Sequence, residues 1–340
     1  MRYEDGDIAI RTEQLLKTFN VRQKKQGITA SLKNFIKPVY KEIHAVNSLS
    51  MEIKSGEIVG FLGPNGAGKT TTLKMLSGLL VPTSGSISVK GFDPFERNPE
   101  YLKQISLVMG QKQNLWWDLP PADTFEIHKS MYSIPDDEYK TIRDTLVDML
   151  EISDCLETQA RKLSLGQRMR CELALSLLHK PSILFLDEPT IGLDIIMQKK
   201  IRKFLAEYHK IYSPTILLTS HYMDDVEALA ERVIVINHGR KVYDGSIDSL
   251  TGTWKDTKTV SLFLECDNPP ESLIAKYQPT AKEGHLFKFS VKTHEMGDFM
   301  NSVYSSCEVS DLSVESVELE EIIGELFMMQ SEETELRENA

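Results

Sequence analysis

No stretch of the sequence reaches the roughly 20 apolar residues that a membrane-spanning helix needs. The longest charge-free stretch, 75–89, is interrupted by Gly78, Pro82 and Gly85. The opening segment MRYEDGDIAI is acidic and lacks the long apolar core of a secretory signal. We therefore expect neither a membrane-spanning nor a secreted protein.

Cysteine is scarce, and positive charge is in the minority. The 4 cysteines lie far apart with no metal-ligand spacing, so we expect a reduced cytosolic compartment and no disulfide scaffold. The 340 residues include 50 acidic and 39 basic side chains, a formal net charge of −11, which disfavours bulk binding of nucleic acid. Apolar residues make up 41%, enough for a sizeable core, and the length suggests two domains.

Short apolar runs alternate with helical patterns over most of the chain. The runs that we expect to form buried strands are 58–62, 105–109, 182–186, 215–219 and 233–236. A helix is predicted over 71–80. Continuous apolar runs are typical of parallel strands covered by helices on both faces, so the predicted fold class is α/β.

A turn-rich segment, DGSIDSLTGTWKD, follows this pattern and predicts a domain boundary. We expect a first domain over 1–248, a small α/β domain over 256–330 and a polar tail over 331–340. Within the small domain, the predicted elements are strands at 259–266 and 286–292 and helices at 295–305 and 319–329. The stretch 22–41 stands apart because it carries basic residues and no acidic one.

The segment GPNGAGKT, 63–70, fits the phosphate-loop pattern G-x-x-x-x-G-K-[ST] between a predicted strand and a predicted helix. Its glycines allow a tight turn in which backbone N–H groups point at phosphate oxygens. We expect Lys69 to reach the β- and γ-phosphates, Thr70 to bind Mg²⁺ and Thr71 to touch the α-phosphate. The alternative is an ordinary glycine-rich turn. The predicted nucleotide-binding residues of the loop are Gly63, Pro64, Asn65, Gly66, Ala67, Gly68, Lys69, Thr70 and Thr71.

Two further segments contain side chains suited to binding a metal ion or a ligand. ILFLDEPT is an apolar strand that ends in Asp187, a carboxylate suited to Mg²⁺, and continues with Glu188, which can take a proton from an attacking water. Helix capping is the alternative role for this pair. LSLGQ, 163–167, precedes a helical run, with Ser164 as a good N-cap and Gly166 allowing close approach of a ligand.

The ordered set of motifs resembles the nucleotide-binding subunit of an ABC transporter, over roughly 8–248. The motifs are, in chain order, GPNGAGKT, Gln111, LSLGQ, ILFLDEPT, IGLD and His221. The resemblance implies ATP and Mg²⁺ as ligands. It also implies a P-loop cassette with a mixed sheet core, a helical subdomain at about 112–165 and an antiparallel β subdomain. The family signature is LSGGQ; here Leu165 replaces the first glycine, while Ser164, Gly166 and Gln167 remain.

The resemblance further implies roles for single residues. Gln111 would be the lid residue that senses Mg²⁺ and the γ-phosphate, with Gln113 as a rival. His221 would be the switch histidine that touches the γ-phosphate. Asp194 would bridge to a partner subunit.

An aromatic side chain should stack on the adenine ring. Phe19 fits the end of the first strand, and Tyr40 is the alternative, at the other end of the basic insert 20–41. Within that insert, apolar residues at helical spacing predict a short amphipathic helix that meets the permease or anionic lipid headgroups. The alternative is a surface loop packed on its own domain, because charge runs are usually solvated faces. In the family, the helical subdomain contacts a cytoplasmic helix of the permease. Trp116 and Trp117 either line the groove for that helix or pack in the core.

In the family, the signature completes the ATP site of a second copy, so the resemblance implies a homodimer of cassettes and a separate permease. It implies peripheral association with the cytoplasmic face of the cell membrane and no nucleic-acid partner. The run of motifs most resembles exporters, with import as the alternative. Other functions considered are a soluble ABC ATPase acting on ribosomes or DNA, and a non-catalytic scaffold. The small C-terminal domain resembles an accessory domain with a dimer-contact, regulatory or passive role.

Overall fold

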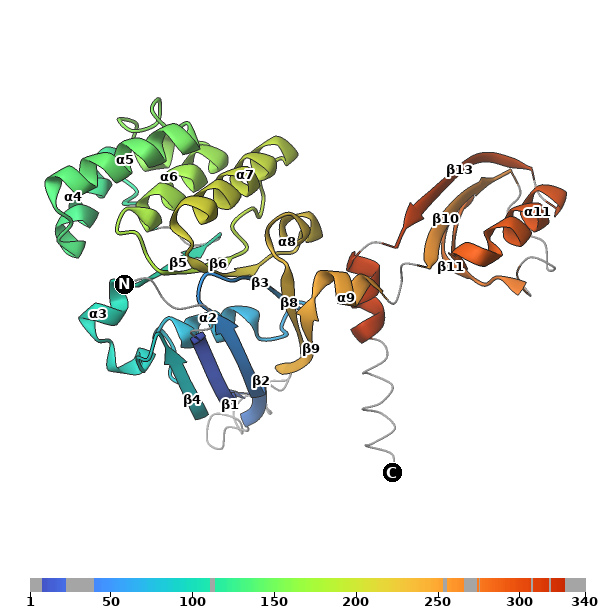
Figure 1. Cartoon of the computed structure of the whole chain (residues 1–340), viewed down its shortest axis with the longest axis horizontal. Helices are drawn as coiled ribbons and strands as arrows, with labels where there is room; N and C mark the ends of the chain where they lie inside the picture. The colour runs from blue at the N-terminus through green and yellow to red at the C-terminus, as the bar shows by residue number, and fades with distance from the viewer. Residues whose placement is uncertain are drawn as a thin grey trace, which may run out of the picture. The chain divides into compact units, whose positions relative to one another are not determined.

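The computed structural model describes residues 8–22, 40–110, 114–252, 256–265, 274, 276–306, 308–317 and 319–327. The chain divides into two compact units, 1–244 and 245–340 (Figure 1). Within the described ranges, no helix combines the length and apolar character needed to cross a membrane.

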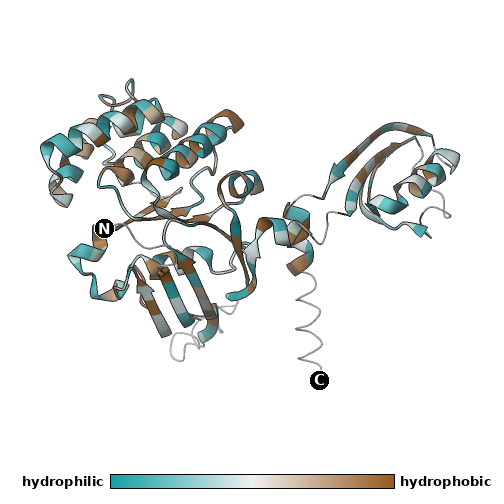
Figure 2. Cartoon of the chain, in the orientation of Figure 1, coloured by the Kyte–Doolittle hydropathy of each residue, from teal (hydrophilic) through white to brown (hydrophobic). Residues whose placement is uncertain are grey.

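A six-stranded sheet forms the centre of the first unit, in the order β5–β6–β7–β3–β8–β9. Its strands are β5 (Ile105–Met109), β6 (Ile183–Asp187), β7 (Thr215–Thr219), β3 (Ile58–Leu62), β8 (Arg232–Asn237) and β9 (Arg240–Ser246). The strands from β5 to β8 run parallel. The predicted strands 58–62, 105–109 and 215–219 are confirmed, and the other two differ by one residue at their ends. Figure 2 shows that this sheet is largely hydrophobic.

Alternate residues of the sheet face two different cores. Leu184 and Leu186 of β6 pack with the helices α5 (Asp136–Leu150), α6 (Leu165–Leu177) and α7 (Ile195–Tyr212). Ile183 and Phe185 of the same strand pack with α2 (Lys69–Leu76) and the antiparallel strands. The continuous apolar run therefore follows from burial on both faces, and α6 and α2 lie on opposite faces of the sheet (Figure 1).

A three-stranded antiparallel sheet covers the α2 side, in the order β2–β1–β4. Its strands are β1 (Ile8–Arg22), β2 (Tyr40–Lys54) and β4 (Ser84–Val89). The described residues of this unit also form the helices η1 (Pro94–Glu96), α3 (Pro99–Leu102), α4 (Pro121–Tyr132), η2 (Ala160–Lys162) and α8 (Met223–Leu229). The basic residues between β1 and β2, at 23–39, lie outside the described residues, and so does the amphipathic helix predicted for them.

The helix after the phosphate loop was predicted over 71–80, but it runs from Lys69 to Leu76. It ends early because Gly78 adopts a left-handed conformation, with φ +72°. A Cβ at Gly78 would lie 2.3 Å from the carbonyl oxygen of Pro94, so a side chain there would clash with backbone. Leu79 and Leu80 turn back and both donate to the carbonyl of Lys74, at 2.9 and 3.0 Å.

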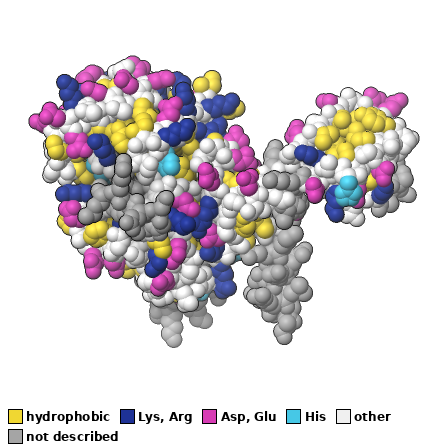
Figure 3. Space-filling view, in the orientation of Figure 1, with side chains coloured by type: hydrophobic (Ala, Val, Ile, Leu, Met, Phe, Trp, Pro, Cys, Tyr) yellow, Lys and Arg dark blue, Asp and Glu magenta, His cyan; other side chains and the backbone are white. Residues whose placement is uncertain are grey.

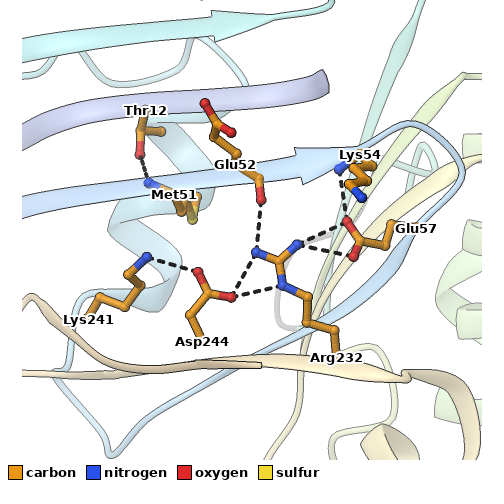
Figure 4. Close-up of polar contacts among 8 residues, drawn as sticks. All are labelled: Thr12, Met51, Glu52, Lys54, Glu57, Arg232, Lys241 and Asp244. Atoms are coloured by element: carbon orange, nitrogen blue, oxygen red, sulfur yellow. Dashed lines mark hydrogen bonds and ion pairs between the residues drawn. The ribbon is translucent and has the colours of Figure 1, made fainter. Parts of the chain in front are cut away.

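Arg232 of β8 fastens the antiparallel sheet to the central sheet (Figure 4). Its guanidinium donates to both carboxylate oxygens of Glu57 at 3.1 Å, to Asp244 at 2.8 Å and to the carbonyl of Glu52 at 3.0 Å. Lys241 adds a second contact to Asp244, at 2.9 Å. A half-buried guanidinium with this many charge-assisted bonds holds β2, β8 and β9 in fixed register.

The second unit has a four-stranded antiparallel sheet in the order β11–β12–β10–β13. Its elements are α9 (Ile247–Gly252), β10 (Thr257–Leu264), β11 (Pro279–Glu283), β12 (Leu286–Lys292), η3 (Thr293–Glu295), α11 (Met296–Ser306) and β13 (Val309–Ser316), and 319–327 is helical. Phe287 and Phe289 pack against Phe299 of α11. The strand over 286–292 is confirmed, whereas β11 and β13 were not predicted, because PTAKE and VSDLSVES lack an apolar run. Hydrophobic side chains gather on one face of this unit (Figure 3).

Candidate nucleotide site

The phosphate loop, 63–70, is pressed against backbone on one side. A Cβ at Gly63 would lie 2.3 Å from the carbonyl oxygen of Ile236, and one at Gly68 would lie 2.3 Å from that of Ala45. At Gly66, with φ +82°, no described atom lies within 4 Å of the same position. Packing therefore requires glycine at 63 and 68, whereas at 66 the left-handed conformation requires it and the loop is open to a ligand.

Lys69 is held over this loop. Its side chain is buried, and the ammonium donates to the carbonyls of Gly63 at 2.5 Å and Pro64 at 3.2 Å. Burial lowers the pKa of Lys69, and the charges of Glu188 and Asp187 oppose that shift. The loop thus presents a positive charge close to its backbone, as phosphate binding requires.

The start of α2 adds to this positive potential. Its N-cap is Gly68, with φ 107°, and among the described residues no side chain accepts its first N–H groups. Unpaired N–H groups and the helix dipole attract anions at such an end. Thr71 lies in this first turn, beside Thr70.

Asp187 accepts two hydroxyl bonds at the end of β6. Thr70 donates to its Oδ2 and Thr219, at the end of β7, to its Oδ1, each at 2.8 Å. The Thr219 hydroxyl also accepts from the N–H of Glu188 at 3.1 Å. A buried carboxylate with a neighbouring hydroxyl offers the oxygen donors that Mg²⁺ prefers, so these residues fit the metal implied by the sequence.

Glu188 and His221 meet next to this carboxylate. Glu188 has a left-handed backbone, with φ 55°, and His221 Nε2 donates to its Oε1 at 2.8 Å. The Glu188 side chain is 18% exposed and the His221 side chain 39%, so solvent reaches both. A carboxylate and an imidazole in contact beside a phosphate loop can move a proton and orient a phosphoryl group.

Two functional neighbours were missed by sequence reasoning. Thr219 holds Asp187 and Glu188 together, and Gly110 allows β5 to approach Glu188, because a Cβ there would lie 2.2 Å from the Glu188 carbonyl oxygen. Threonine at a strand end is common, so only the parallel register of β6 and β7 identifies it. Gln111 and Gln113 lie outside the described residues.

The two candidate adenine-stacking aromatics lie on paired strands. Phe19 of β1 is opposite Ile43, and Tyr40 of β2 is opposite Arg22. Because the register from 18 to 22 is regular, the two side chains lie on opposite faces of the ribbon. Their exposed fractions are 38% and 58%, so both are accessible.

The signature segment forms a capping box at the start of α6. The Ser164 hydroxyl accepts from the N–H of Gln167 at 3.2 Å, and the Gln167 side chain accepts from the N–H of Ser164 at 2.9 Å. Gly166 lies against Met197 of α7, where a Cβ would come within 3.2 Å. Asp194 caps α7, accepting from the N–H of Met197 at 2.9 Å.

The structure thus brings together Lys69, Thr70, Asp187, Glu188 and His221, and it places the signature on α6, which packs on the other face of the sheet from α2. Leu165 is 43% exposed. It lies over Gly192, where a Cβ would be 3.2 Å from the leucine Cδ2.

This arrangement is that of an ATP-binding cassette. The ABC transporter family model matches residues 46–191. The ABC transporter ATP-binding protein NatA of Bacillus subtilis (strain 168) is 35% identical over 210 residues, covering 62% of this chain and 85% of NatA. Nod factor export ATP-binding protein I of Burkholderia orbicola (strain AU 1054) is 35% identical over 215 residues, covering 62% of this chain and 69% of the relative.

Among solved structures, cbiO1 from Clostridium perfringens, part of the ABC transporter complex cbiONQ, has a TM-score of 0.59 and 26% identity. The alignment covers 72% of this chain and 91% of cbiO1. The chain belongs to the ATP-binding subunits of ABC transporters. It therefore binds ATP and is an ATPase, and the resemblance and fold class predicted from the sequence are confirmed.

Proposed function

We propose that two copies of this chain close over two ATP molecules and that their opening drives export through a separate transmembrane permease. The observation that carries this proposal is the separation of the signature from the phosphate loop. Helices α6 and α2 pack on opposite faces of the central sheet. A second copy, placed head to tail, would bring Ser164 and Gly166 to the phosphates bound at Lys69.

Within each site, the contacts support the following roles. Lys69 and the N–H groups at the start of α2 bind the phosphates. Thr70 and Asp187 would hold Mg²⁺, which would neutralise phosphate charge. Glu188 takes the proton of the attacking water, and His221 contacts the γ-phosphate. The bond between Glu188 and His221 keeps the base oriented before the water attacks.

A cavity of about 460 Å³ in the first unit provides the docking site for the permease. Leu79, Leu107, Ile127 and Met131 supply apolar walls, and Trp116 lies at the edge with 55% exposure. A cavity with apolar walls and an exposed aromatic suits an amphipathic helix that inserts its apolar face. We propose that a cytoplasmic helix of the permease occupies it, which would place the protein at the cytoplasmic face of the membrane.

Two contacts connect the segment beside this cavity to the signature helix α6, and the first of them is buried. Glu172 of α6 is 2% exposed, and its carboxylate accepts from the N–H groups of Asn114 and of Leu115, the latter at 3.1 Å. Arg168, one turn earlier, lies over the Trp117 ring at 4.7 Å. Movement of the segment that carries Trp116 and Trp117 would therefore move α6, and with it Ser164.

The direction of transport rests on the relatives. The Burkholderia protein is named for Nod factor export, and its similarity covers the cassette. Import is the competing outcome. A vesicle assay with the permease that co-purifies from membranes of the native host would decide between them, and recovery without any membrane partner would contradict the proposal.

The dimer is tested by cross-linking. Chains with Asn65→Cys and chains with Leu165→Cys are mixed, so that a disulfide can join the phosphate loop of one copy to the signature of another. With Glu188→Gln in both chains, we expect the mixed cross-link only when ATP and Mg²⁺ are present, and none in either variant alone. A cross-link formed equally without ATP, or none at all, would contradict head-to-tail closure.

A further inference from the structure

Asp225 of α8 is a buried carboxylate outside the site described above, with 1% exposure. Its Oδ2 accepts from the Thr190 hydroxyl and, at 2.8 Å, from the Ser220 hydroxyl. Its Oδ1 accepts from Arg202 of α7 at 2.9 Å. One carboxylate thus joins the loop after β6, helix α7 and the loop after β7.

Two of these segments carry the proposed catalytic pair. Thr190 lies two residues after Glu188, and Ser220 directly precedes His221. The Ser220 hydroxyl also accepts from the N–H of Tyr222 at 3.0 Å, so it shapes the loop on both sides of His221. Glu188 and His221 bond to each other at 2.8 Å, which closes a ring through Thr190, Asp225 and Ser220.

The neighbouring Asp224 is exposed, and within the described residues its carboxylate bonds to neither of the segments that carry Glu188 and His221. It lies 3.6 Å from the same Arg202 guanidinium, but its side chain is 81% exposed. Its only described ion pair is this one, whereas Asp225 also receives two hydroxyl bonds. The chain therefore contains a matched pair of aspartates on one helix, one linked to the catalytic segments and one not.

We propose that Asp225 is a positioning residue for hydrolysis, which sets the spacing of Glu188 and His221 through Thr190 and Ser220. This proposal rests on the roles assigned to Glu188 and His221 above. A displacement of a base by a fraction of an ångström lowers the rate of a proton transfer strongly, whereas ATP binding depends on the phosphate loop, which Asp225 does not contact. Loss of Asp225 should thus reduce kcat and spare the KM for ATP.

The test measures ATP hydrolysis by the full chain with Asp225→Asn and with Asp224→Asn as the matched control. The amide of Asp225→Asn places an NH₂ group where an oxygen accepts hydroxyl bonds, so we expect kcat to fall about thirtyfold with KM changed less than threefold. Asp224→Asn should keep the kcat of the natural chain. Equal kcat in all three proteins, or equal losses in the two variants, would overturn the proposal.

A second comparison covers the case in which Asp225→Asn fails to fold. Thr190→Val removes the hydroxyl and Thr190→Ser keeps it, so the serine variant should recover the turnover that the valine variant loses, at similar thermal stability. A serine variant as slow as the valine variant would overturn the proposal. The Glu188→Gln control separates failure of this proposal from failure of the proposed function. If Glu188→Gln hydrolyses ATP at the natural rate, the role of Glu188 in the proposed function is wrong.

Discussion

The two halves of the proposed ATP site differ in how their side chains are used within one chain. At the phosphate-loop end, Asp187 and Glu188 lie at the end of β6 and His221 follows β7, and these side chains contact each other or Thr70 and Thr219. At the signature end, Ser164 and Asp194 cap their own helices. The first half joins the phosphate loop to the ends of β6 and β7 by tertiary contacts. The second half has a local structural role, and its proposed chemical role requires a partner copy.

The largest expected effect tests the first half. Glu188→Gln removes the proposed base while keeping its size, so turnover should fall about a thousandfold. The proposed ATP-bound dimer should then persist in light scattering during gel filtration. Glu207→Gln, an exposed carboxylate that pairs with Lys203, is the control and should hydrolyse ATP normally. Natural turnover in Glu188→Gln would remove Glu188 from its role.

The pH dependence of stability extends the comparison to the cavity proposed to bind the permease. His128 and His179 lie 3.3 Å apart between their ring nitrogens, and His128 lines the cavity. Burial, with the charge of His179, lowers the pKa of His128 to about 3, and burial lowers that of His179 to about 4. Below pH 6.5 the unfolded chain binds protons that the folded chain does not, so the folded state loses stability as pH falls.

At pH 5, each of these histidines should cost about 2 kcal/mol of unfolding free energy relative to pH 7.5, a factor of about thirty. Urea unfolding at several pH values measures it. The double variant His128→Gln/His179→Gln should show a flatter pH dependence, because other titrating groups are unchanged. The same slope in both proteins would show that the pair does not titrate as expected.

Replacing Ser164 tests the second half. Ser164→Ala removes an N-cap, which costs about 1 kcal/mol of stability, and it removes the hydroxyl proposed to contact the partner's ATP, which should lower kcat about tenfold. Asn98 caps α3 by accepting from the N–H of Glu100 at 2.9 Å, so Asn98→Ala loses a cap alone. If both variants lose only stability, Ser164 is a cap and nothing more.

The smallest effect concerns adenine. Because Phe19 and Tyr40 lie on opposite faces of their ribbon, only one of them should stack on the base. The corresponding alanine variant should raise the KM for ATP about fivefold, at the low end of what base stacking contributes. Titration of both variants in parallel identifies the aromatic, and an equal rise in both would contradict the opposite-face geometry.

The parts of the fold that could be predicted are those with a local signal. The strand 58–62 and the phosphate loop carry an apolar run and a motif in sequence, and both are found in place. The end of α2 at Leu76 was missed because Gly78 acts as a stop only through its left-handed conformation against Pro94. Strand β13 was missed because VSDLSVES, an edge strand with mostly exposed side chains, lacks an apolar run.

Within the site, sequence identified the residues that belong to motifs and missed those that support them. Thr219 and Asp225 are ordinary residue types, and they matter only because parallel pairing of β6 and β7 brings 187 beside 219, and because α8 turns Asp225 back under the same loops. The meeting of 187 and 219 depends on β6 and β7 lying side by side in the sheet, which no motif in the sequence specifies.

The capping box at Ser164 has a consequence for which residue can stand there. A hydroxyl can accept from the N–H of Gln167 through a lone pair and still offer its own hydrogen to an anion. Aspartate would terminate the helix equally well, yet it has no hydrogen to give and would repel a nucleotide's negative charge. Serine is thus a side chain that can cap α6 and still donate to the triphosphate of the proposed partner copy.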